Sequence, residues 1–365
     1  MMQIAALDTW LPSGPGPAII SGPCSAETPE QLRATIEALA PLQLPLYRAG
    51  IWKPRTRPNT FEGNGEEALK WIAELKKEKG YRFAVEVASP AHVALALKYD
   101  IDVLWIGARS TVNPFTVQEI ADSLRGTDIP VMIKNPVNPD LALWMGAIER
   151  ISQAGITKLA AIHRGFSSFE KSRYRNQPMW QIPIELKTEL PELPLFCDPS
   201  HIGGDRDMIF PISQESLDLL YDGLMIESHI DPDNAWSDAK QQVTPASLGQ
   251  IISQLQTRQL NSNNPRFYQS MEEIRHRIDQ ADREILEAMT KRMRLVQEVG
   301  VYKKENNVSI LQLARWKEIF KSRSEWAEKL QLDPDFARDL YRIIHLASIR
   351  EQTAVMEEKK DEHAT

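Results

Sequence analysis

The segment Leu224-Met225-Ile226-Glu227-Ser228-His229 is a short apolar run that ends in a carboxylate, and it is the last of eight such runs. Most of these runs are continuously apolar rather than alternating, as expected for strands that are buried on both faces. The predicted strands are Ala18–Ser21, Pro45–Ala49, Phe83–Val87, Val103–Ile106, Val131–Lys134, Leu159–His163, Leu193–Cys197 and Leu224–Glu227.

Amphipathic stretches separate the predicted strands, among them Glu67–Lys79, Ala91–Lys98 and Pro139–Gln153. A regular series of strand-then-helix units from Ala18 to about Arg258 indicates an α/β fold, a (β/α)₈ TIM barrel. In such barrels the active-site residues lie on the loops that follow the strands. An open, doubly wound sheet is the alternative that this pattern alone leaves open.

Bulk composition restricts the class of protein. The chain has 365 residues, 42% hydrophobic and 25% charged, which is ordinary for a globular protein. A net charge of −7 gives no support for binding nucleic acid. Only two cysteines are present, no apolar stretch reaches the roughly 20 residues of a membrane span, and no signal-peptide pattern opens the chain. We therefore expect a cytoplasmic enzyme that acts neither on nucleic acid nor at a membrane.

After the barrel region the sequence pattern changes from alternating strands and helices to long helices. We expect a barrel domain over residues 1–258, a polar linker over 259–268, an all-α three-helix domain over 269–356 and a polar tail over 357–365. The first long helix is predicted from about Ser270 to Lys304, and two shorter ones over Leu311–Leu330 and Pro334–Met356. The long helix would measure about 50 Å. Two shorter helices cannot cover its apolar stripe, so a homodimer through this domain is expected, with a tetramer as a further possibility.

Four side chains of the barrel region have the chemistry of metal ligands. Closure of a barrel puts the eighth strand beside the first, so the residues that follow strands one, seven and eight meet at one mouth. These residues are Cys24, His201, Glu227 and Asp238. A thiolate, an imidazole and two carboxylates suit Mn²⁺, Fe²⁺, Co²⁺ or Zn²⁺ better than Mg²⁺ or Ca²⁺. Taken singly, Cys24 also fits a small core residue and His201 a turn residue.

Cations follow the other predicted strands. Arg48, Lys53, Arg109, Lys134 and Arg164 lie at or just after strands two, four, five and six. So many inward-facing cations beside a divalent ion would repel one another in an empty site. They therefore predict an anionic substrate with more than one phosphate or carboxylate group.

The barrel motifs, taken together and in order, resemble those of 3-deoxy-D-arabino-heptulosonate 7-phosphate (DAHP) synthases of the short, type I-beta form. The resemblance covers about residues 15–258. Its motifs are Gly22-Pro23-Cys24-Ser25, Lys53-Pro54-Arg55-Thr56, Gly107-Ala108-Arg109, Lys134-Asn135, His163-Arg164-Gly165, Pro199-Ser200-His201 and Glu227-Ser228-His229. The resemblance implies a metal-dependent condensation of phosphoenolpyruvate with erythrose 4-phosphate.

The resemblance also implies roles for single residues. Cys24, His201, Glu227 and Asp238 would bind the metal. Arg109, Lys134 and Arg164 would hold phosphoenolpyruvate, with Arg48 and Lys53 nearby. Arg55 and Thr56 would bind the sugar phosphate, and Lys53 would deliver a proton to the new alkoxide. A related enzyme that uses arabinose 5-phosphate is the rival, and Lys53-Pro54-Arg55-Thr56 argues against it.

The helical region from about Met271 to Gln352 resembles an all-helical chorismate mutase, which rearranges chorismate to prephenate. The resemblance implies that Arg275, Arg292, Arg315 and Ser348 bind the substrate and that Lys303 and Gln352 act at its ether oxygen. At about 100° per residue, Arg292 and Lys303 fall within about 20° of each other. Arg275 points about 100° away from Arg292, so it fits the partner protomer's site.

Two residues depart from the resemblance. Trp316 stands where an acidic residue often binds the substrate hydroxyl, and Gln312 stands where Asp is common. A helical module that only dimerises and senses a ligand is therefore the alternative. Because no other candidate regulatory segment precedes the first strand, we also expect chorismate or prephenate to restrain the barrel through this domain.

Overall fold

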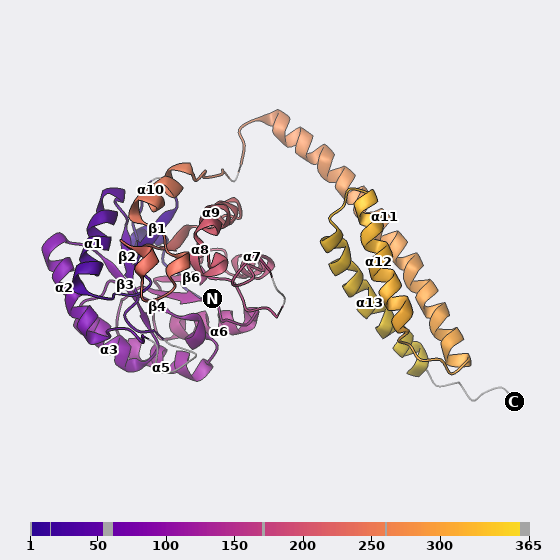
Figure 1. The fold of residues 1–365 in the computed structure, drawn as a ribbon, viewed down its shortest axis with the longest axis horizontal. Helices are drawn as coiled ribbons and strands as arrows, with labels where there is room; N and C mark the ends of the chain where they lie inside the picture. Colours follow the sequence, from indigo (N-terminus) through magenta and orange to yellow (C-terminus); the bar gives the residue numbers. More distant parts are fainter. Residues whose placement is uncertain (1, 15, 54–60, 170–171, 260, 358–365) are drawn as a thin grey trace. The chain divides into compact units, whose positions relative to one another are not determined.

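The computed structural model describes residues 2–14, 16–53, 61–169, 172–259 and 261–357. The chain divides into two compact units, Met1–Gln259 and Leu260–Thr365. Each unit is described by itself below (Figure 1).

The first unit is a closed barrel of parallel strands in the order β1-β2-β3-β4-β5-β6-β7-β8. Closure is made by β1 and β8, which pair from Ala18↔Gly223 to Gly22↔Glu227. This confirms the predicted barrel and excludes the open sheet. The strand bounds are β1 (Ala18–Gly22), β2 (Leu46–Ala49), β3 (Phe83–Val87), β4 (Val103–Ile106), β5 (Val131–Lys134), β6 (Leu159–His163), β7 (Leu195–Cys197) and β8 (Gly223–Glu227).

Helices surround the strands, as Figure 1 shows. Their α-helical bounds are α1 (Pro29–Leu39), α2 (Glu66–Lys79), α3 (Pro90–Lys98), α4 (Ala108–Thr111), α5 (Pro114–Leu124), α6 (Leu141–Gln153), α7 (Gln181–Glu189), α8 (Pro199–Gly203), α9 (Ile209–Asp218) and α10 (Pro245–Gln254). Short 3₁₀ helices are η1 (Leu7–Thr9), η2 (Ala40–Leu42), η3 (Arg206–Met208), η4 (Pro232–Asn234) and η5 (Ala239–Gln241).

Local sequence fixes where several of these helices begin. Thr28 and Thr244 each accept a hydrogen bond from a backbone N–H of the first turn, and a proline follows each of them. A side-chain cap followed by proline satisfies an otherwise unpaired donor and presets the backbone angle. Asp198 starts α8 in the same way, immediately after β7. This cap places His201 at the barrel mouth.

Two apolar clusters build the barrel. One lies between the strands and the surrounding helices. The other fills the barrel interior and includes Trp105, Met132, Phe196 and Met225, with Trp10 and Leu11 from the N-terminal segment. The indole of Trp105 is fully buried, and it forms an apolar floor beneath the polar mouth.

The second unit consists of α11 (Pro265–Glu305), α12 (Leu313–Lys329) and α13 (Pro334–Glu357). The last of these helices packs against both others. Gly300 of α11 allows a close approach, because a Cβ there would lie 3.3 Å from Val355 Cβ. In the described chain no helix is long and apolar enough to cross a membrane.

Helix α11 begins at Pro265, earlier than the expected start near Ser270 and inside the segment that was expected to be linker. The reason is local. Asn264 caps the helix by accepting a hydrogen bond from Arg266 N, and Pro265 occupies its first turn. Polar composition indicated a linker here, but the Asn-Pro pair starts a helix.

Gly223 and Gly146 offer a matched test of barrel packing. A Cβ on Gly223 would lie 2.3 Å from the Phe196 ring and 2.4 Å from Ala18 O, whereas one on Gly146 in α6 would meet nothing within 4 Å. We expect Gly223→Ala to lower the free energy of unfolding by at least about 1–3 kcal/mol. Gly146→Ala should raise it by about 0.5–1 kcal/mol, because alanine is the better helix former. Urea unfolding followed by circular dichroism measures both; equal midpoints for the two variants would contradict this account.

Candidate active sites

The four predicted metal ligands lie at the carboxyl-terminal mouth of the barrel. Cys24 follows β1, His201 lies in α8 after β7, Glu227 ends β8 and Asp238 directly precedes η5. They form two close pairs. The Cys24 thiol donates to Asp238 Oδ2 at 3.3 Å, and His201 Nε2 lies 3.8 Å from Glu227 Oε1.

Within the described residues, no three or more His, Cys, Asp or Glu side chains already form a ligand group. Cations of the protein lie among the four side chains. Lys53 Nζ donates to Cys24 Sγ at 2.9 Å, and Arg175 Nη1 donates to Asp238 Oδ1 at 2.8 Å. Burial, reinforced by the charge of Glu227, raises the pKa of the Cys24 thiol to about 12. In this arrangement the thiol is protonated.

Glu227 is fully buried and has one unused acceptor. Gln241 Nε2 donates to its Oε2 at 2.6 Å. Its Oε1 lies 3.1 Å from Arg48 Nη2 but accepts no well-formed hydrogen bond from a described residue. Burial alone would raise its pKa, but His201 and Arg48 outweigh burial and the pKa of Glu227 is lowered. This buried oxygen therefore forms an ion pair with Arg48 but accepts no well-formed hydrogen bond from a described residue.

Asp198 connects the imidazole to the cationic side of the mouth. Its Oδ1 accepts from His201 N at 3.1 Å and so caps α8. Its Oδ2 lies 2.8 Å from His201 Nδ1 and 2.6 Å from Lys134 Nζ. Burial alone would raise the pKa of this carboxyl, but His201 and Lys134 hold it well below its usual range. Burial outweighs the carboxylates of Asp198 and Glu227 and lowers the pKa of His201.

Sequence reasoning gave Asp198 and Arg175 no role. Asp198 carried a signal, because Asp-Pro directly after a strand predicts a helix cap at the mouth. Arg175 carried none, since it lies in the loop between β6 and α7 without a periodic pattern around it. Its guanidinium contacts Asp238 and Gln241, and it outweighs burial to lower the pKa of Asp238.

Predicted anion-binding cations line the same mouth. Arg48 is almost fully buried, lies 5.0 Å above the Trp105 ring, and its Nε and Nη1 have no hydrogen-bond partner among the described residues. Lys134 is likewise buried. Arg164 Nη1 donates to Asn176 Oδ1 at 2.7 Å. Burial and, in addition, the charges of Arg175 and Arg109 lower the pKa of Arg164 to about 10, so these cations are near enough to repel one another.

Arg109 is exposed on α4, and its positive charge contributes to the lowered pKa of Arg164. Arg55 and Thr56 lie outside the described residues, so their predicted contact with a sugar phosphate stays a prediction.

The helical unit brings four of its six predicted residues together. Arg292 Nη1 on α11 donates to Ser348 Oγ on α13 at 2.7 Å. Lys303 Nζ donates to Gln352 Oε1 at 3.0 Å and to Ile310 O at 2.6 Å. Ser348 and Gln352 are buried, and burial lowers the pKa of both Arg292 and Lys303. Two partly desolvated cations thus share one site.

Arg275 and Arg315 are not part of this cluster within one chain. Arg275 pairs with Glu272 at 2.9 Å and Arg315 with Glu318 at 2.8 Å, and all four side chains are exposed. Trp316, at the position where an acid was expected, packs edge-on against the His345 ring with centroids 3.9 Å apart.

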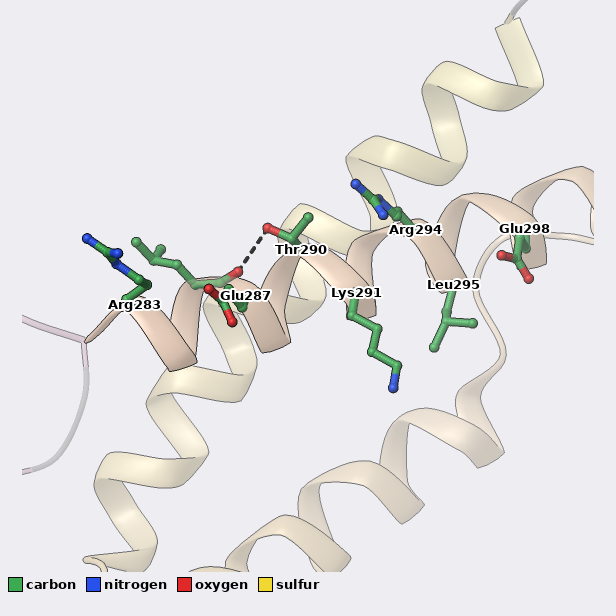
Figure 2. A pocket seen from close by; sticks show the side chains of 8 residues that line it. Arg283, Glu287, Thr290, Lys291, Arg294, Leu295 and Glu298 are labelled. Carbon is green, nitrogen blue, oxygen red and sulfur yellow. Dashed lines mark hydrogen bonds between the residues drawn. The ribbon is translucent and has the colours of Figure 1, made fainter. Parts of the chain in front are cut away.

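A separate groove of about 420 Å³ runs along α11 alone (Figure 2). Leu286 and Leu295 supply its apolar surface. Around them lie Arg283, Glu287, Thr290, Lys291, Arg294 and Glu298. Figure 2 shows these side chains projecting from one helix.

Comparison with known proteins identifies the family of each unit. Residues 11–261 match the DAHP synthetase I family, and residues 274–353 match chorismate mutase type II. A phospho-2-dehydro-3-deoxyheptonate aldolase of Thermotoga maritima is 31% identical over 237 residues, 65% of this chain and 68% of that protein. A 2-dehydro-3-deoxyphosphooctonate aldolase of Wolinella succinogenes is 26% identical over 65% of this chain and 97% of its own length.

A solved structure supports the same assignment. The crystal structure of the Thermotoga maritima DAHP synthase superposes with a TM-score of 0.59 at 28% identity, over 69% of this chain and 71% of that one. A truncated form of the enzyme from that organism gives a TM-score of 0.56 at 27% identity, over 65% and 84%. The chain therefore belongs to the DAHP synthetase I family, carries a chorismate mutase type II domain after its barrel, and combines the two activities of these domains.

Proposed function

We propose that the barrel condenses phosphoenolpyruvate with erythrose 4-phosphate and that it uses a divalent Mn, Fe, Co or Zn ion. The observation that carries this proposal is the convergence of the Cys24–Asp238 and His201–Glu227 pairs at one mouth. The buried Oε1 of Glu227, which accepts no well-formed hydrogen bond from a described residue, supports a ligand there. Both cysteines are unpaired, which suits the reducing cytoplasm where we place the enzyme.

The donor set fits a borderline-soft ion. Cys24, His201, Glu227 and Asp238 would hold it, and the ion would act as a Lewis acid on a substrate oxygen. Thiolate ligation requires the Cys24 thiol to lose its proton. The sulfur would then bind the ion instead of accepting the hydrogen bond from Lys53, and the ammonium group of Lys53 would remain at the mouth. That position supports the role of Lys53 in delivering a proton to the alkoxide.

Phosphoenolpyruvate would bind to the cations on the other side of the mouth. Lys134, Arg164 and Arg109 would hold its phosphate and carboxylate groups, and Arg48 has two unused nitrogens nearby. Burial, and after it the charges of Arg175 and Arg109, lower the pKa of Arg164. A polyanionic substrate would neutralise this repulsion, which favours binding. Arg55 and Thr56 are proposed for the second substrate's phosphate from sequence alone.

Removal of the ion tests the proposal for the barrel. Chelation followed by desalting should reduce DAHP formation to background, and Mn²⁺, Fe²⁺, Co²⁺ or Zn²⁺ should restore it. Cys24→Ala should bind these ions more weakly, because it lacks the sulfur ligand. Cys197→Ala is the matched control, since this thiol is buried in the core outside the proposed ligand set. Metal content and phosphate release would be measured together; full activity in protein shown to be free of metal would refute metal dependence.

For the helical unit, we propose that Arg292 grips a carboxylate of chorismate while Lys303 and Gln352 stabilise the ether oxygen. The Lys303–Gln352 hydrogen bond already places these two groups side by side. A pericyclic rearrangement needs no nucleophile, only a compact substrate pose and stabilisation of charge at the breaking C–O bond. Ser348 would orient Arg292 and contact the substrate.

A second copy of the chain would complete this site. Ile274, Ile278, Ile285, Leu286 and Leu295 on α11 are each 48–67% exposed. Such a series of exposed apolar side chains marks an association surface. We propose a homodimer through the helical unit, with Arg275 contributed by the partner and Arg315 turning from Glu318 to the substrate.

Complementation between two inactive variants tests this shared site. Arg275→Ala and Arg292→Ala should each reduce mutase kcat roughly 10²–10³-fold. A mixture of the two proteins should regain activity, because a heterodimer has one site with both arginines. Arg338→Ala, which removes an exposed arginine of α13 that pairs with Asp335, is the control. Loss of chorismate absorbance gives the rate; a mixture no more active than its parts would contradict a site shared between protomers.

We further propose that chorismate or prephenate bound to the helical unit restrains DAHP formation. The fusion of both activities in one chain supports this coupling. Prephenate should slow phosphate release by the intact enzyme, and Arg292→Ala should abolish the effect because it weakens binding of the carboxylate. An unchanged wild-type rate at saturating prephenate would reject feedback by prephenate.

A further inference from the structure

The helical unit contains a buried histidine nitrogen that has no hydrogen-bond partner among the described residues. This nitrogen is Nε2 of His345. His345 lies on α13 one turn before Ser348, the residue that contacts Arg292. A buried unsatisfied nitrogen costs free energy unless a ligand completes it.

Ser348 and Gln352, the neighbouring polar side chains of α13, already have hydrogen-bond partners. Ser348 Oγ accepts from Arg292 and donates to Ile344 O at 2.7 Å. Gln352 accepts from Lys303 and donates to Ser348 O at 3.2 Å. His345 therefore differs from these two side chains, because its Nε2 has no hydrogen-bond partner among the described residues.

Neighbouring rings and charges define the state of His345. The Trp316 indole of α12 packs edge-on against it, and Phe320 packs on Trp316 with centroids 4.6 Å apart. Burial, together with Arg292 and Lys303 of α11, lowers the pKa of His345. The imidazole is thus held against Trp316, and the charges of Arg292 and Lys303 disfavour its protonation.

Chorismate contains two carboxylates, an ether oxygen and one ring hydroxyl. The arginines and Lys303 match the anionic groups and the ether oxygen. A hydroxyl is neutral, both donates and accepts, and needs no full charge opposite it. Trp316 has no acceptor to offer this hydroxyl, whereas the adjoining imidazole has a free nitrogen.

We propose that His345 Nε2 hydrogen-bonds the ring hydroxyl of chorismate and is a specificity-determining residue of the mutase site. This inference rests on the proposed binding of chorismate by Arg292 and Lys303. Nε2 can serve in either tautomer, because the hydroxyl can donate to its lone pair or accept from its N–H.

Two substrates separate this role from a structural one: chorismate and an analogue that lacks the ring hydroxyl. The intact enzyme should prefer chorismate, since a site built to pair a hydroxyl is left unpaired by the analogue. His345→Phe keeps an aromatic ring against Trp316 but removes the nitrogen. It should lower kcat/KM for chorismate roughly 10- to 100-fold and leave kcat/KM for the analogue within about threefold.

His345→Gln supplies an amide in place of the imidazole and should regain part of the preference for chorismate. Arg292→Ala serves as the comparison, because it should reduce kcat/KM for both substrates equally. Equal losses on both substrates in His345→Phe, at an unchanged melting temperature, would overturn the inference about His345. If Arg292→Ala left both rates unchanged, the proposed binding of chorismate would fail instead.

Discussion

Pairing of β1 with β8 in the register Gly22↔Glu227 closes the barrel, and the metal-candidate residues converge through it. The closure depends on backbone as much as on side chains. Gly22 adopts a φ of +150°, and a Cβ there would lie 2.0 Å from Arg48 O. Only glycine accommodates both demands. Because β1 can therefore lie tightly between β2 and β8, Cys24 and Arg48 both arrive at the same mouth as Glu227.

This mouth concentrates buried charge, which stabilises a protein poorly. The Arg48–Glu227 and Lys134–Asp198 pairs are nearly excluded from water. Desolvation of such groups costs several kcal/mol per ion, and replacing a buried pair by apolar side chains is often neutral or stabilising. The barrel interior beneath is apolar and filled by Trp105 and its neighbours. Charge therefore accumulates where chemistry is proposed, above a core that supplies the stability.

The sequence predicted the repeating architecture well because strands buried on both faces leave a strong apolar signal. Predicted strand limits agree with the structure to within two residues. Positions at strand ends, such as Lys134 and Glu227, followed from that pattern. Arg175 could not be found, since it reaches Asp238 from a loop whose path no periodicity encodes. The resemblance to chorismate mutases implied that Arg292 and Lys303 share a site, and helical spacing agreed with it. Helical spacing could not pair Trp316 with His345, because that contact depends on how α12 packs against α13.

Asp198 positions several groups of the barrel mouth at once. One carboxylate accepts hydrogen bonds from a backbone N–H of α8 and from an ammonium group, and it lies 2.8 Å from an imidazole nitrogen. No other natural side chain except a carboxylate offers enough acceptor positions and a compensating charge for all three. The longer Glu would displace them. The same side chain thus positions both the histidine and the lysine. A substitution at this position would therefore disturb both residues together.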